Sequence, residues 1–409
     1  MADDDMMRSS DAPHVRHRAA PSLREAMPHL EERAIAHRRH LHRRPELSGE
    51  EHETTRYIAD RLRGLGIRHL DFAGPGVVAQ IDAGRAGGPI VALRADIDAL
   101  PVPEDGAKAT VSERPGVSHA CGHDGHTAIL LTVAEWAAAH VDRLRTSVRF
   151  IFQSSEEQIP SGAERLVRMG ALEGVDHIFG LHLWQELDRG NVGVVDGAMM
   201  ASTDDFDITL RGPGGHGAMP QESIDLIVTA ARLVTDLQTI VGRKQDPLRP
   251  LVITTGHLEA HGNHNVLPAQ ALLQGTVRAL DQETRDDAQR WLTEATDAAA
   301  AQSGADIDLV YRRGTPPVIN DPVAAAFVRT AAENHCSDAV VAPVRPVMGG
   351  EDFSFYLEQR PGAFAFIGMG GPLSRHGHHT PLFDIDEEVL ITGVELMVGI
   401  IHEYGWEHG

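Results

Sequence analysis

The sequence predicts an α/β protein with a mostly parallel central sheet and a second, inserted unit built differently. At 409 residues the chain is too long for one ordinary hydrophobic core. Short β-branched or aromatic runs alternate with helical stretches through its first half, which is typical of a layered α/β domain. From Thr203 to Arg313 the order changes to strand, helix, strand, strand, helix, strand. That is the order of a ferredoxin-like unit, complete in itself.

The first half of the chain supplies the predicted sheet and its helices. Apolar residues recur at helical spacing from Leu30 to Arg43, and Pro45 provides a stop just beyond. Further helices are predicted from Glu50 to Leu65 and from Thr127 to Ala139. The predicted strands are Val77 to Ile81, Ile90 to Leu93, Val148 to Phe152 and Ile178 to Leu183. Ligands of such sheets bind beyond the carboxyl ends of the strands.

The inserted unit separates the α/β domain into two segments of the chain. Its predicted strands and helices are, in order, Phe206 to Leu210, Ile224 to Val241, Leu251 to Leu258, Ala271 to Leu280, Arg285 to Ala301 and Ile307 to Tyr311. The α/β pattern resumes from Pro316, with helices at Pro322 to Asn334 and Glu387 to Glu403. We therefore expect one domain from residues 23–202 and 314–409, an inserted domain at 203–313, and a disordered tail at 1–22.

Composition excludes several classes of partner. The formal charge of −22, from 59 acidic and 37 basic residues, repels phosphate backbones and anionic membrane surfaces. The longest apolar runs, such as Ala128 to Val133, are far below the roughly 18 to 20 residues that span a bilayer. Cys121 and Cys336 show no disulfide spacing, and the amino-terminal segment lacks the apolar core of a signal peptide. We expect a cytoplasmic protein that binds neither nucleic acid nor membrane.

The strongest functional pattern lies just before a predicted helix. Between Ser118 and His126 one cysteine and three histidines fall within nine residues. Cys121 and His123 are two apart, so both side chains can point at one ion. A buried cysteine beside surface histidines would account for Cys121 alone, but it explains the whole cluster poorly. The pattern therefore favours a metal site.

Three further segments of the sequence contain side chains that could belong to the same metal site. Glu156 and Glu157 directly follow an apolar strand, where one carboxylate could bind metal while the other activates water. His182 is a lone histidine in an apolar strand, a setting more typical of a hydrogen-bonded core residue. His379 belongs to a histidine-rich loop that composition alone would assign to solvent. Only their convergence in space would make them a site.

Six short motifs, which occur together and in this order along the chain, resemble those of a known protein family. They are His42 to Glu46, Leu93 to Pro101, Cys121 to Asp124, Gly214 to Ala218, Asn265 to Pro268 and Gly350 to Phe353. From about Leu23 onward the chain resembles the dinuclear metal aminoacylase and carboxypeptidase superfamily. Within it, the chain is similar to the amidohydrolase branch of hippurate hydrolases, N-acyl-amino-acid amidohydrolases and plant auxin-conjugate hydrolases.

The resemblance implies a site that holds two divalent ions. Zinc or manganese suits these ligand types, and cobalt or nickel is an alternative. Glu156 is implied to be the general base, and Asp96 to orient a ligand from behind. Cys121 resembles the shared ligand in the implied ligand set of Cys121, His123, Glu157, His182 and His379.

The resemblance also implies that the inserted domain completes the site as a lid and dimerisation domain. His216 is implied to reach across a homodimer, or a dimer-based tetramer, to stabilise the oxyanion. Asn265, Arg278 and Glu351 are implied to bind substrate, and the fork of an arginine suits a carboxylate.

The implied reaction is hydrolysis of an N-acyl amino acid to a carboxylic acid and a free amino acid. A dipeptidase or carboxypeptidase on the same scaffold remains an alternative, as does a non-catalytic metal-dependent binding protein. A cysteine nucleophile at Cys121 is disfavoured, because the other predicted ligands would then lack a role.

Overall fold

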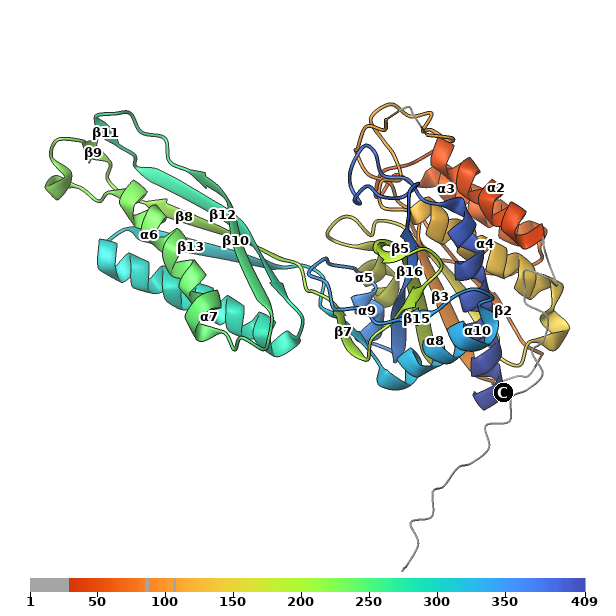
Figure 1. The fold of residues 1–409 in the computed structure, drawn as a ribbon. Coiled ribbons are helices and arrows are strands. Elements are labelled where there is room, and N and C mark those ends of the chain that lie inside the picture. The colour runs from red at the N-terminus through yellow and green to blue at the C-terminus, as the bar shows by residue number, and fades with distance from the viewer. Residues whose placement is uncertain (1–28, 85–87, 106–107, 409) are drawn as a thin grey trace, which may run out of the picture.

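The chain folds into two lobes joined by a narrow connection (Figure 1). The computed structural model describes residues 29–84, 88–105 and 108–408, so the predicted tail at residues 1–22 lies outside the described residues. No described helix is both long enough and apolar enough to cross a membrane.

The first lobe is built on an eight-stranded sheet with a parallel centre. In spatial order its strands are β1 (Arg68–Leu70), β2 (Val77–Ile81), β4 (Ser147–Gln153), β3 (Ile90–Asp96), β5 (His177–Asp188), β16 (Gly362–Gly370), β6 (Val192–Gly193) and β15 (Val341–Ala342). β4, β3, β5 and β16 run parallel to one another, while β2 and β6 flank them antiparallel. The predicted α/β class with a largely parallel central sheet is confirmed.

Helices bury both faces of this sheet, which explains the near-continuous apolar strands. Leu93 and Phe150 pack toward one face, and their neighbours Ala92 and Ile151 pack toward the other. The first face is covered by α2 (His29–Arg43), α3 (His52–Gly64), α4 (His123–Ala139), α8 (Pro322–His335) and α10 (Leu390–His408). The other is covered by the shorter α5 (Gly162–Arg168) and α9 (Ser354–Leu357).

The second lobe has its own sheet and its own core. The sheet is antiparallel in the order β10 (Leu251–Glu259), β12 (Gln270–Ala279), β8 (Asp204–Arg211), β13 (Asp306–Arg313), with α6 (Leu226–Thr239) and α7 (Gln282–Ser303) packed on it. This connectivity is the split β-α-β arrangement. Asp225 and Asp281 cap the two helices by accepting backbone N–H bonds. β9 (Gly215–His216) pairs with β11 (Val266–Leu267) at the end of the lobe farthest from the eight-stranded sheet (Figure 1).

Smaller elements complete the chain. Near the connection between the lobes, β7 (Gly197–Met200) pairs with β14 (Val318–Asn320). Short helical turns lie at Val141–Arg143, Pro220–Glu222, Ile240–Lys244 and Glu387–Val389.

Two predicted helices begin at other residues in the structure, and the first of them carries a predicted ligand. The helix predicted from Thr127 begins four residues earlier, at His123, because Gly122 at φ +90° turns the chain directly into it. The helix predicted from Glu387 is divided, with a 3₁₀ turn capped by Asp386 before α10 starts at Leu390.

Candidate metal centre

The predicted metal ligands converge beyond the carboxyl ends of the parallel strands. Glu157 lies on the turn after β4, His182 on β5, and His379 on the loop after β16. Cys121 and His123 come from the turn that opens α4. Four segments far apart in sequence therefore meet where open α/β sheets hold their ligands.

The ligand atoms fall into two overlapping groups. Atoms of Cys121, His123 and His182 lie within 4.8 Å of one another, and so do atoms of Cys121, Glu157 and His379. The Cys121 Sγ is 3.5 Å from His182 Nε2, and the His379 Nε2 is 3.1 Å from Glu157 Oε1. Because Cys121 belongs to both groups, its sulfur lies where one ligand could serve two ions.

Hydrogen bonds orient the two buried imidazoles. His123 Nδ1 lies 3.1 Å from both the backbone oxygen and Oδ1 of Asp98, and His182 Nδ1 lies 2.8 Å from the Leu183 carbonyl oxygen. Since an Nδ1–H donates in both cases, Nε2 is the ring atom left to face the site. Although burial favours the neutral ring, the carboxylates of Asp96 and Asp98 raise the pKa of His123 to about 10, so a bound metal would take the place of the proton on its Nε2.

The Nε2 of His123 is buried with no hydrogen-bond partner among the described residues, and Glu157 Oε1 has His379 Nε2, another predicted ligand, 3.1 Å away. Ligand atoms that face one another without other partners fit a bound cation.

The electrostatics of the site also favour a cation. Burial, reinforced by the carboxylates of Glu157 and Glu156, raises the pKa of the Cys121 thiol well above its usual range. A thiolate here therefore needs a positive charge beside it, which a coordinated metal supplies. Burial and neighbouring histidines lower the pKa of His182 well below its usual value, so this ring is neutral. The donor set fits the predicted pair of divalent ions.

The two adjacent glutamates have different surroundings. Both carboxylates approach His123 Nε2 to 4.0 Å. The Glu157 backbone N–H donates to Asp98 Oδ2 at 3.0 Å, which fixes this residue beside the ligands. Burial and the carboxylate of Glu351 raise the pKa of Glu156 well above the usual range. A carboxylate with raised proton affinity suits a group that takes a proton from water and returns it.

Backbone strain is concentrated at this site. Ser155 (φ 57°) and His379 (φ 62°) are the two non-glycine residues with positive φ in the described part of the chain. Such conformations are disfavoured for residues with a Cβ and persist where surrounding contacts impose them. One precedes the glutamate pair, and the other is a predicted ligand.

A buried guanidinium organises the carboxylates behind the ligands. Arg94 pairs with Asp96 Oδ2 at 2.8 Å, Glu351 Oε1 at 3.0 Å and Asp352 Oδ1 at 2.7 Å. Glu351 Oε1 also accepts the Phe353 N–H, so the side chain of this predicted substrate residue is held inside the protein. Arg94 lies within the Leu93 to Pro101 motif, but sequence reasoning assigned it no role.

The structure gives Asp96 and Asp98 distinct partners. Asp96 Oδ1 contacts His126 Nδ1 at 2.7 Å, and His126 Nε2 accepts the N–H of Leu183, next to His182. Asp98, which lies within the Leu93 to Pro101 motif but had no predicted role, is the carboxylate that contacts His123 and the Glu157 N–H. The feature of the sequence that could have indicated this role is its position two residues after Asp96, just beyond a predicted strand.

The predicted residues of the second lobe divide between its two ends. His216 is in β9, where its Nδ1 accepts the Ala218 N–H, and the Asn265 carbonyl accepts the Gly217 N–H. These two residues therefore lie together at the end remote from the metal ligands (Figure 1). Arg278 is near the other end, one residue before Ala279, whose carbonyl accepts the N–H of Ser202. Within one chain the structure does not bring His216 to the metal ligands.

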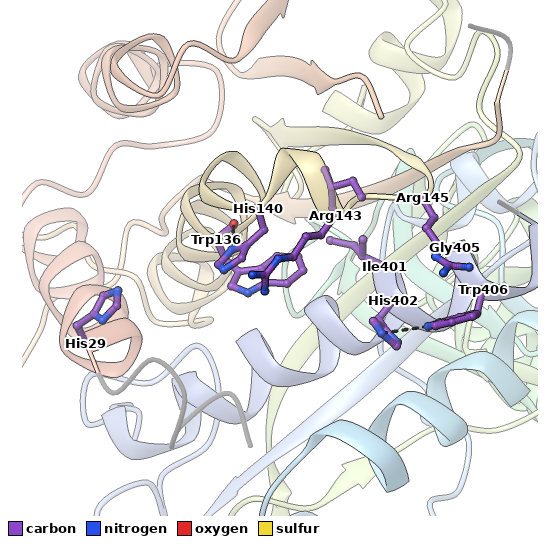
Figure 2. Close-up of a pocket in the computed structure, with 10 residues that line it drawn as sticks. His29, Trp136, His140, Arg143, Arg145, Ile401, His402, Gly405 and Trp406 are labelled. Atoms are coloured by element: carbon purple, nitrogen blue, oxygen red, sulfur yellow. Dashed lines mark hydrogen bonds between the residues drawn. The ribbon is translucent and has the colours of Figure 1, made fainter. Parts of the chain in front are cut away.

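A cavity of about 670 Å³ lies elsewhere, among α4, η1 (Val141–Arg143) and α10 (Figure 2). Trp136, His140, Arg143 and Trp406 are among its lining residues, and it contains none of the predicted site residues. Beside it, His335, His402 and Glu403 also bring possible ligand atoms within 4.8 Å. These groups already satisfy one another, since His335 contacts Glu403 at 2.8 Å and the Trp406 Nε1–H donates to His402 Nε2. We therefore assign no site to them.

Comparison with known proteins establishes the family. Residues 92–403 match the family described as Peptidase family M20/M25/M40. This chain belongs to that family. Family membership makes it an enzyme, a hydrolase of amide bonds, as the sequence predicted.

Individual M20 relatives cover most of the chain. The N-acetyl-L-cysteine deacetylase of Bacillus subtilis (strain 168) is 40% identical over 363 residues, 88% of this chain and 86% of the relative. The N-acyl-L-amino acid amidohydrolase of Geobacillus stearothermophilus is 44% identical over 289 residues, 70% of this chain and 77% of the relative. The crystal structure of B. subtilis YXEP, described as a dinuclear metal binding peptidase from the M20 family, superposes with a TM-score of 0.82. It is 34% identical and covers 93% of this chain and 99% of that chain.

Proposed function

We propose that this M20 hydrolase cleaves the amide bond of N-acyl amino acids in a metal-dependent reaction, releasing a carboxylic acid and a free amino acid. The observation that carries this proposal is the position of Glu156. Its carboxylate lies 4.0 Å from the ligand atom of His123 and directly precedes Glu157 in the chain. A protein that only bound metal would have no use for this second, proton-accepting carboxylate.

Cys121, His123, Glu157, His182 and His379 would hold two divalent ions, zinc or manganese, with Cys121 between them. When bound, such a pair polarises an amide carbonyl and lowers the pKa of water. Glu156 would accept the proton of the attacking water and return it to the leaving amine. Asp98 orients His123, and Asp96 holds His126 against the β5 backbone.

We further propose that the second lobe completes the site from a neighbouring subunit of a dimer. His216 lies at the remote end of its own chain's second lobe, so a partner's His216 is the one that could reach the metals and donate to the oxyanion (Figure 1). Asn265 lies beside His216 and would accompany it, whereas Arg278 lies near the connection to its own first lobe. Asn265 and Arg278 would then bind the polar end of the substrate. Glu351, which was also expected to bind substrate, is buried and paired with Arg94 and the Phe353 N–H, so it would act on the site from behind.

The names of the relatives support the substrate class, since two of them act on N-acetyl-L-cysteine or N-acyl-L-amino acids. A dipeptidase is the nearest alternative, and it would need acceptors for the α-ammonium group of its substrate. The two functions differ in the charge at one position of the substrate, so matched substrates can separate them.

The test is a screen of N-acetyl, N-benzoyl and N-indolylacetyl amino acids against dipeptides of the same carboxyl-terminal residue. The protein would be reconstituted with zinc, manganese or cobalt, and product amine would be measured. We expect turnover of at least one N-acyl series, loss of activity with a chelator, and recovery with metal. Preference for dipeptides would favour the alternative, and full activity in protein shown by elemental analysis to be metal-free would overturn the proposal.

A further inference from the structure

The turn after β4 holds the proposed base in a strained conformation. Ser155, directly before Glu156, has φ 57°, a region that residues with a Cβ rarely adopt. Strain of this kind persists only where neighbouring groups impose it. The groups that hold Ser155 therefore also control where the next side chain points.

Glu51 is the side chain that holds the Ser155 N–H. Its Oε1 accepts that N–H at 2.8 Å, although 104 residues separate the two in sequence. Glu51 immediately precedes α3 but makes no side-chain cap on that helix. It is fully buried, and its Oε2 has no hydrogen-bond partner among the described residues. Burial of a half-satisfied carboxylate is costly, so this position is not explained by the stability of α3.

Buried carboxylates hold the backbone N–H groups of the residues before and after Glu156. Glu51 accepts the N–H of Ser155, and Asp98 accepts the N–H of Glu157 at 3.0 Å. The Ser155 carbonyl in turn accepts the Gly162 N–H at 2.9 Å. Gly49, two residues before Glu51, has φ +85°, a conformation that residues with a Cβ rarely adopt, and this turn leads the chain into the Glu51 segment. Two buried carboxylates thus clamp the backbone around the residue between them.

We propose that Glu51 is a positioning residue, which holds Ser155 in its left-handed conformation and thereby aims the Glu156 carboxylate into the site. The inference rests on the proposed role of Glu156 as general base. It assigns Glu51 no contact with substrate or metal. Its loss should therefore lower kcat while metal content and KM change little.

The test compares side chains of similar size at position 51. Glu51→Met keeps the volume but removes the acceptor, and kcat should fall roughly 100-fold, as small displacements of a catalytic group do. Glu51→Gln keeps an acceptor and should retain most of the turnover. Glu53→Met is a matched control two residues further on, in the first turn of α3, since the Glu53 side chain is half-exposed and pairs with Arg114. This variant should leave kcat unchanged.

A second substitution tests the mechanism. Glycine adopts positive φ without strain, so Ser155→Gly added to Glu51→Met should restore part of the lost turnover. Thermal unfolding and elemental analysis would show that each variant is folded and metal-loaded. If Glu51→Met does not fold, Glu51→Ala, whose side chain has no acceptor, replaces it in the same comparisons.

The outcomes separate this inference from the proposed function. A kcat of Glu51→Met close to that of the unmodified enzyme, an equal loss in Glu51→Gln, or no recovery with Ser155→Gly would each overturn the positioning role. If these occur while Glu156→Gln is inactive, the proposed function stands without Glu51. If Glu156→Gln is itself fully active, the proposed base and the inference built on it both fail.

Discussion

The sulfur of Cys121 lies 3.5 Å from Nε2 of His182, although the two residues are 61 positions apart. Cys121 sits on the turn into α4 and His182 on the central strand β5, and both side chains are buried. The same sulfur is also within 4.8 Å of the ligand atoms of Glu157 and His379. A single side chain thus links both groups of possible ligands.

This arrangement predicts unequal losses of metal. Cys121→Ala removes a ligand common to both groups and should lower the occupancy of both ions. His182→Ala removes a ligand of one group and should lower metal content by about one ion per chain at most. Elemental analysis of dialysed variants would measure this, with Cys336→Ala as the control, because Cys336 is buried against Thr392 instead. Equal stoichiometry in the two ligand variants would contradict a shared sulfur.

The adjacent glutamates should separate into base and ligand. Glu156→Gln is expected to keep its metals and lose roughly 100- to 10,000-fold in turnover, the range for a general acid-base group. Glu157→Gln should lower metal content as well, because its Oε1 lies 3.1 Å from His379 Nε2 and 4.0 Å from His123 Nε2, among the predicted ligand atoms. Activity and metal content would be measured on the same preparations. If Glu156→Gln loses metal and Glu157→Gln keeps it, then Glu157 is the base and Glu156 is the ligand.

Subunit mixing tests the contribution of His216. Loss of a preorganised oxyanion donor typically costs about 100- to 1,000-fold in turnover, so His216→Ala should be nearly inactive yet folded and metal-loaded. When it is mixed with Glu156→Gln under subunit exchange, one hybrid site has both intact residues, and part of the activity should return. Exchange would be monitored with differently labelled subunits. No recovery despite exchange would mean that His216 acts in its own chain or not at all.

A buried carboxylate outside the site predicts acid sensitivity. Although burial favours the neutral acid, hydrogen bonds from His37 and Arg33 lower the pKa of Glu135 to about 2. Because the folded-state pKa lies below the usual value of 4.5, the stabilisation is complete above that value and is lost as pH falls toward 2.

Glu135→Gln should therefore lower the free energy of unfolding near pH 7 by about 1 to 3 kcal/mol. The estimate is modest because the Arg33 side chain is 47% exposed. Urea unfolding should show the difference from the unmodified protein shrinking at about pH 3. Glu53→Gln, which removes only a surface pair, should change stability by less than about 1 kcal/mol at either pH. A difference that grows on acidification would contradict the shifted pKa.

Local pattern determined much of this protein from sequence alone. Buried parallel strands are apolar on both faces, so β3, β4 and β5 were recognisable as short apolar runs. The order of elements from Thr203 to Arg313 likewise predicted the four-stranded lobe, since apolar residues recur at a different spacing in helices and in strands. The ligand types were also visible, because cysteine, histidine and carboxylate side chains at close spacing have few other uses.

Tertiary structure decided what each of those side chains touches. Whether His182 is a core residue or a site residue depends on the turn of Cys121, which lies 61 positions away. Asp98 had no predicted role, yet it contacts both His123 and Glu157 because β3 and β4 end at the same edge of the sheet. Glu51 and Ser155 carry no motif between them, and their contact exists only because α3 packs beside the β4 turn. Hydrogen bonds and charge interactions act over a few ångströms of space, whereas sequence patterns report only neighbours along the chain, so the ligand types were predictable and their partners were not.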